Sequence, residues 1–122
     1  MSIRGIRGAT VAQVNTKEAI VLATEELLVA IFQRNTIPIE EIASIFFSAT
    51  SDLTAEFPAV AARKMGLLDT PLFCVTEVAV PDSLGKCIRV LLHVNTDLDQ
   101  KDMQHVYLKE AITLRSNPCT PT

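Results

Sequence analysis

One long segment near the amino terminus has apolar residues at helical spacing. The positions lie three or four residues apart and so share one face of a helix: Ile20, Ala23, Leu27, Leu28 and Ile31. Asn15 followed by Glu18 fits a capping box, in which each side chain binds the backbone amide of the other residue. The pattern predicts one amphipathic helix that begins after Asn15 and ends near Asn35.

Shorter segments rich in β-branched and aromatic residues predict strands. We expect an opening strand at residues 3–10, internal strands at 43–50 and 72–77, a long apolar strand at 87–94, and the last strands within 106–114. A short helical turn is expected after Pro38. A second helix is expected from Pro58 to Gly66, because proline suits a first turn and glycine suits a helix end.

This order of elements is typical of an α/β or α+β fold with a mixed sheet. We expect one domain over residues 1–115 and a flexible, polar tail over 116–122. One long helix covers only part of one sheet face, so the other face needs a partner. Apolar residues make up 48 % of the 122 residues, and the mean hydropathy is +0.29. This surplus predicts that the second face packs against further copies of the chain in a closed ring.

Composition narrows the class of protein. The net charge of −3 lacks the basic excess of nucleic-acid-binding proteins. No apolar run approaches the length of about 18 residues that spans a membrane, and the first residues lack the apolar region of a secretory signal. Three cysteines without metal-ligand spacing and only two histidines argue against a metal site, and they indicate reduced thiols in a cytoplasmic protein.

Arg89 stands in the middle of an apolar segment, after Ile88 and before Val90. A lone buried cation is costly, so this arginine must face a cavity, an ion partner or an interface. A structural ion pair with Glu77 is one interpretation, and a functional cation is the other. Glu77 itself ends an apolar segment, where an ordinary strand-end charge is also expected.

Three further side chains also have an ordinary structural interpretation. Arg7 is flanked by glycines, which permit close approach of a ligand, but a solvated edge-strand arginine has the same pattern. Tyr107 is the only tyrosine, and such a residue often serves packing. Cys74 fits a small buried hydrophobe as well as a reactive thiol. Arginines, one carboxylate and one phenol suit the binding of a small anion, and no common catalytic motif is present.

Together, several segments resemble the small monofunctional chorismate mutases of the trimeric, non-helical class. The resemblance runs in register from residue 1 to about 115. The segments that carry it are Ile3 to Thr10, Ser48 to Thr50, Asp52-Leu53, Phe57 to Ala59, Cys87 to Val90 and His105 to Leu108.

The resemblance implies a trimeric pseudo-α/β-barrel with its active sites in clefts between adjacent subunits. The implied activity is the Claisen rearrangement of chorismate to prephenate, an isomerisation toward phenylalanine and tyrosine, without a metal or cofactor. Two other classes stay open. One is a trimeric imine-hydrolysing enzyme with a similar barrel, and the other is a non-catalytic trimer that binds a small anion.

The resemblance also implies residue roles. Arg89 would stabilise the ether oxygen, Arg7 would hold a carboxylate, and Glu77 would accept from the ring hydroxyl. Tyr107 would donate to a carboxylate, and Cys74 would line the pocket without covalent chemistry. The walls and the entrance of the pocket would be formed by Phe57, Ala59, Phe73, Leu114 and Arg63. Val60 stands where the family often has lysine, so one entrance cation is missing.

Overall fold

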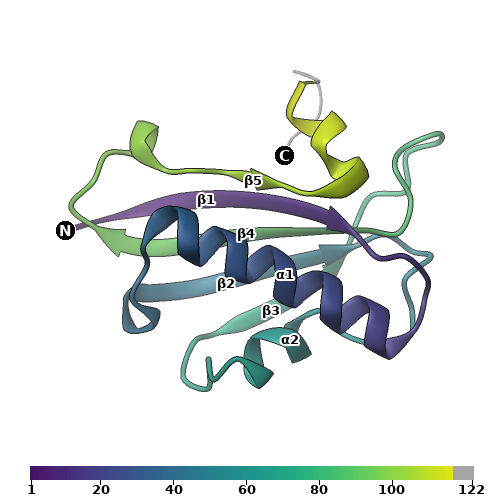
Figure 1. The fold of residues 1–122 in the computed structure, drawn as a ribbon, viewed down its shortest axis with the longest axis horizontal. Helices are drawn as coiled ribbons and strands as arrows, with labels where there is room; N and C mark the ends of the chain where they lie inside the picture. The colour runs from purple at the N-terminus through teal and green to yellow at the C-terminus, as the bar shows by residue number, and fades with distance from the viewer. Residues whose placement is uncertain (117–122) are drawn as a thin grey trace.

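A five-stranded mixed sheet forms the centre of the computed structural model, which describes the backbone of residues 1–116 and the side chains of residues 1–114. The strand order is β3-β2-β4-β1-β5 (Figure 1). Both β1 and β2 run antiparallel to β4, whereas β3 is parallel to β2 and β5 is parallel to β1. The expected mixed sheet is therefore confirmed. Its strands are β1 (Ser2–Val11), β2 (Ile42–Ala49), β3 (Leu72–Thr76), β4 (Cys87–Thr96) and β5 (Val106–Tyr107).

The long helix predicted from apolar spacing is α1 (Lys17–Asn35), and the second predicted helix is α2 (Ala59–Lys64). Three short 3₁₀ helices complete the described elements: η1 (Ile39–Glu41), η2 (Gln100–Asp102) and η3 (Lys109–Ser116). The predicted cap of α1 is wrong by one residue. Thr16 is the cap, because its hydroxyl accepts a hydrogen bond from the amide of Ala19 at 3.1 Å.

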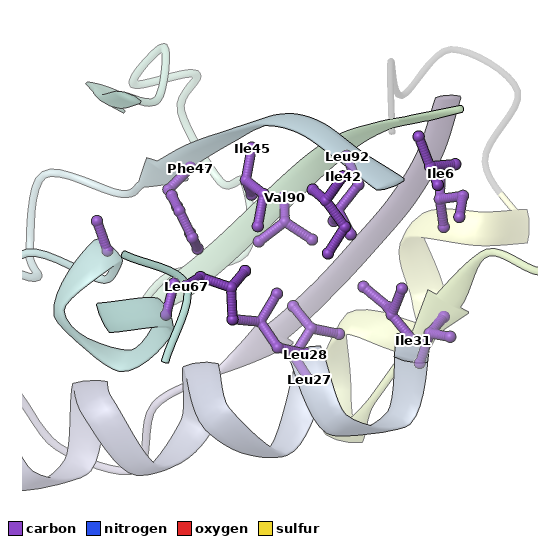
Figure 2. Packing of buried hydrophobic residues seen from close by; sticks show 14 of the residues in the cluster. Ile6, Leu27, Leu28, Ile31, Ile42, Ile45, Phe47, Leu67, Val90 and Leu92 are labelled. Carbon is purple, nitrogen blue, oxygen red and sulfur yellow. The ribbon is translucent and has the colours of Figure 1, made fainter. Parts of the chain in front are cut away.

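Both helices cover the same face of the sheet (Figure 1). The apolar positions of α1 that the pattern singled out are all buried. Leu27, Leu28 and Ile31 pack on residues from β1, β2 and β4 (Figure 2), while Ile20 and Ala23 belong to a second cluster that includes Ile88 of β4. The helix lies very close to β1 at Gly8, where an added Cβ would come within 2.8 Å of the Cδ1 atom of Ile31. Side chains alternate along a strand, so neighbouring Arg7 points to the opposite face of the sheet.

Two expectations about strands are wrong. The segment 72–77 was expected to be internal, but β3 lies at the edge of the sheet, and Phe73 is 60 % exposed. The segment 106–114 was expected to hold strands, but β5 has only two residues. Lys109 has a positive φ of 54°, which ends the extended backbone, and the chain continues as η3.

The face of the sheet opposite the helices is uncovered in the single chain. Its strands present large apolar side chains to solvent, among them Phe46, Phe73 and Val75. The Phe46 ring makes edge-to-face contacts with Phe73 on one side and His93 on the other, so an aromatic row crosses β3, β2 and β4. This is the kind of surplus apolar surface that the composition indicated.

Within residues 1–116, none of the helices combines the length and the apolar content needed to cross a bilayer. The predicted tail at residues 116–122 lies outside the described residues, apart from the backbone of Ser116, which belongs to η3.

Candidate active site

Two arginines and a carboxylate meet on the uncovered face of the sheet. Arg7 comes from β1 and Arg89 from the neighbouring β4, where Arg7 is paired with Leu91 and Arg89 with Ala9. Glu77 follows β3 directly, and its backbone amide continues the strand ladder by donating to Ala49. All three side chains line one cavity of about 260 Å³, whose other side chains include Phe46, Ser48, Val75 and Leu91.

Arg89 and Glu77 form an ion pair in which Nε of the guanidinium lies 3.1 Å from Oε2 of the carboxylate. Both side chains are largely shielded, with exposed fractions of 14 % and 23 %. The Nε–H does not point closely enough at Oε2 for a hydrogen bond, so the contact between the two side chains is an ion pair only. Such a shielded pair holds the guanidinium beside the carboxylate.

Ser48 orients Glu77, and sequence reasoning gave it no role of its own. Its hydroxyl donates to Oε2 of Glu77 at 3.1 Å. Ser48 lies opposite Arg89 in the register of β2 and β4, so the same serine is next to both members of the ion pair. The one sequence signal for Ser48 was that it belongs to the Ser48-Ala49-Thr50 segment, which carries part of the family resemblance.

A second group of the expected residues lines a separate cavity beside the edge strand β3. Phe57, Ala59, Arg63, Phe73 and Cys74 line a cavity of about 300 Å³ between α2 and β3, together with Val60 and Leu72. Arg63 is the one charged side chain in this described lining, because Val60 brings no cation. Phe57 and Cys74 also line a larger adjoining cavity of about 510 Å³ beside the loop of residues 49–58.

Tyr107 and Leu114 belong to neither group within the single chain. Tyr107 lies on β5, opposite Ala9 of β1, at the edge of the sheet farthest from β3. Leu114 lies in η3, which follows β5, and both side chains are half-buried. One chain therefore does not bring all the expected site residues together.

Two side chains hold the loop that leads to Phe57. Oδ1 of Asn15 accepts hydrogen bonds from the backbone amides of Thr54 and Ala55, at 2.9 and 3.0 Å. Asn15 therefore anchors this loop and does not cap α1. The Asp52 carboxylate accepts from the amide of Lys86 through both oxygens. A hydrogen bond from the Thr50 hydroxyl is the main cause that lowers the pKa of Asp52. These contacts fix the cavity wall without touching its interior.

Of the described cysteines, Cys87 is buried and Cys74 is half-buried. Burial raises the pKa of both Cys74 and Cys87. At Cys74, a hydrogen bond from the backbone of Ala59 and, to a smaller extent, the positive charge of Arg63 only partly oppose the rise. A thiolate is therefore disfavoured at either position. Within the described residues, no group of three or more His, Cys, Asp or Glu side chains has the arrangement that holds a metal ion.

Comparisons with known proteins point to one family. Residues 3–118 match the family model described as chorismate mutase type I. A curated chorismate mutase AroH of Thermus thermophilus is 49 % identical over 114 residues, which are 93 % of this chain and 93 % of that protein. The chorismate mutase AroH of Bacillus subtilis (strain 168) is 43 % identical over 116 residues, which are 94 % of this chain and 91 % of that protein.

The fold matches as well. A solved structure of a chorismate mutase from Clostridium thermocellum superposes with a TM-score of 0.89 and 51 % sequence identity. The match covers 90 % of this chain and 98 % of the solved one.

Proposed function

Because the chain belongs to the chorismate mutase type I family, we propose that it rearranges chorismate to prephenate on the uncovered face of its sheet, around Arg7, Glu77 and Arg89. Chorismate mutase activity, an isomerisation in aromatic amino acid biosynthesis, is the function of this family and of this chain. The residue assignment is carried by one observation, the meeting of these three side chains in a single cavity.

Arg89 is the cation for the reacting ether oxygen. The rearrangement breaks the ether C–O bond as a C–C bond forms, and negative charge grows on that oxygen without any proton transfer. A fixed guanidinium therefore binds the transition state more strongly than the substrate. The ion pair with Glu77 holds the side chain in place, and Arg89 lines the same cavity as Arg7 and Glu77.

The other polar groups orient the substrate. Arg7 binds a carboxylate with two parallel hydrogen bonds, and Tyr107 donates to a carboxylate. Glu77, braced by Ser48, accepts from the ring hydroxyl. Held at these points, chorismate takes the compact form in which its reacting carbons are close together, and this lowers the entropic part of the barrier.

The complete site forms between neighbouring subunits of a homotrimer. Two observations support this proposal. Arg7, Glu77 and Arg89 lie in one cavity while Phe57, Ala59, Arg63, Phe73 and Cys74 lie in another, so a single chain offers two partial sites. The uncovered face also carries an exposed aromatic row that a second chain would bury.

The same family membership bears on the remaining alternatives. None of the comparisons supports an imine-hydrolysing enzyme or a non-catalytic anion-binding protein. We also propose a cytoplasmic location, which is supported by cysteines that show neither disulfide nor metal-site spacing in the sequence.

The activity is tested by incubating the purified protein with chorismate and following the formation of prephenate. We expect conversion without added metal and the same rate after treatment with a chelator, because the reaction needs only fixed charges and shape. A matched sample with Mg²⁺ restored serves as the control. Chorismate left unchanged at micromolar enzyme, or activity lost with the chelator, would contradict the proposal.

Replacing Cys74 by serine separates a wall residue from a nucleophile. We expect Cys74→Ser to lower kcat/KM only a few-fold, because the thiol lines the cavity and its raised pKa disfavours the thiolate. Cys74→Ala, which removes the sulfur without adding a hydroxyl, is assayed beside it as the control for the added oxygen. Complete inactivation of both variants would indicate a covalent role.

A further inference from the structure

The outer edge of β1 is completed mainly by side chains. The strand β5 pairs with β1 only at Gly8 and Ala9. Nearer the start of β1, the side chain of Gln100 takes the place of a neighbouring strand. Its Oε1 accepts from the backbone N–H of Gly5 at 2.8 Å, and its Nε2 donates to the backbone carbonyl of Gly5 at 2.6 Å. Between these contacts, the amide of Arg7 donates to Nδ1 of His105 at 3.0 Å.

The contact with His105 is what holds Arg7 on this edge. No side chain in the described part of the chain forms a hydrogen bond or ion pair with the Arg7 guanidinium, whereas Arg89 is held by Glu77. The direction of the Arg7 side chain therefore depends on its backbone. On one side, the close packing of Gly8 against α1 fixes that backbone, and on the other side Nδ1 of His105 does so.

We infer that His105 is a positioning residue for Arg7, whose Nδ1 lone pair fixes the Arg7 amide and thereby aims the guanidinium at a substrate carboxylate. The inference rests on the proposed role of Arg7. Because Nδ1 accepts, it carries no proton, and the proton of the neutral ring lies on Nε2. Protonation of Nδ1 removes the acceptor and places a second positive charge beside Arg7.

The surroundings of His105 favour the neutral ring. Burial is the larger cause that lowers its pKa below the ordinary value of 6.5, and the positive charge of Arg7 on β1 acts in the same direction. From α1, the neutral Asn35 side chain binds the backbone of the preceding residue, Gln104. The acceptor is thus present at neutral pH and is lost as the pH falls through the lowered pKa.

Two substitutions separate the acceptor from the shape of the ring. Asparagine places Oδ1 where Nδ1 lies, whereas leucine places a methyl group there. We expect His105→Leu to raise KM for chorismate about 10-fold or more with a smaller change in kcat, since misplacement by about 1 Å can cost about 10²-fold. We expect His105→Asn to stay within a few-fold of the wild type.

Gln100→Leu and Arg7→Ala are the controls. Gln100→Leu removes two edge hydrogen bonds at Gly5 and leaves those of Arg7 intact, so we expect little change in KM. Arg7→Ala should itself raise KM strongly, and adding His105→Leu to it should change KM no further. If Arg7→Ala behaves like the wild type, the proposed role of Arg7 fails. If Arg7→Ala does raise KM, the positioning role of His105 fails in either of two cases. In the first, the KM increases of the two single substitutions add up in the double variant, and in the second, Gln100→Leu raises KM as much as His105→Leu does.

A pH profile decides the question even if His105→Leu does not fold. In the wild type, KM should rise as the pH falls below about 6.5 through the pKa of His105, while in His105→Asn it should change less. If KM depends on pH in the same way in the wild type and in His105→Asn, the inference is overturned. It is also overturned if His105→Asn raises KM as much as His105→Leu does.

Discussion

Replacing Arg89 by alanine is expected to lower kcat by about 10²- to 10³-fold or more, equivalent to about 2.7–4 kcal/mol for one preorganised donor, while KM changes far less. The reason is that the contact strengthens only as charge develops on the ether oxygen. The guanidinium starts from a shielded position beside Glu77, where water screens it weakly. Initial rates over a range of chorismate concentrations separate the two constants.

Two further variants show which property of Arg89 matters. Arg89→Lys keeps the charge but loses the rigid, multiple donors, so we expect a kcat between those of the wild type and Arg89→Ala. Arg4→Ala also removes an arginine from the sheet, but Arg4 binds the Leu98 carbonyl and Asp99 outside the cavity. We expect nearly normal kinetics for it. An unchanged kcat with a raised KM in Arg89→Ala would assign Arg89 to ground-state binding instead.

Reversing the charge of Arg63 is expected to raise KM about 10-fold or more at low salt. Chorismate carries two carboxylates, and Arg63 is the one charged side chain in the described lining of the cavity between α2 and β3. Arg63→Glu places a negative charge on the path of a dianion. Because Arg63 is exposed, the fold should tolerate the change.

The adjacent Lys64 provides a matched control. Lys64 is exposed on the same helix but does not line the cavity, so Lys64→Glu makes the same change in net charge. We expect it to leave KM within about 2-fold, and we expect added salt to reduce the effect of Arg63→Glu. Equal effects of the two substitutions would show that only the overall charge matters and that Arg63 has no place at the entrance.

Local patterns explain which parts of the fold were predictable. The helix α1 was found because its apolar spacing lies within one continuous segment. Asn15 was misread because asparagine both caps helices and bridges loops, and the choice depends on residues 54 and 55, far along the chain. The end of β5 was missed because the positive φ of Lys109 leaves no mark in an alternating pattern.

The candidate site was predictable in part for a similar reason. A charge inside an apolar segment signals burial with a partner, and the Arg89–Glu77 ion pair is the partner that this reasoning proposed. The strand order places β3 and β5 at opposite edges, which keeps Tyr107 apart from the expected residues beside β3. Such long-range pairing is not readable from spacing. The contact between His105 and Arg7 spans 98 positions and stayed hidden for the same reason.

The central claim is that each site combines the Arg7, Glu77 and Arg89 group of one chain with the Arg63 group of another, and mixed oligomers test it most directly. Arg89→Ala and Arg63→Glu chains are each assayed alone at low chorismate and low salt, and then after co-assembly in equal amounts. Random mixing in a ring gives about a quarter of the sites both native groups, so we predict recovery of about a quarter of wild-type activity. Activity equal to the mean of the two separate variants would show that each site lies within one chain and would contradict the account.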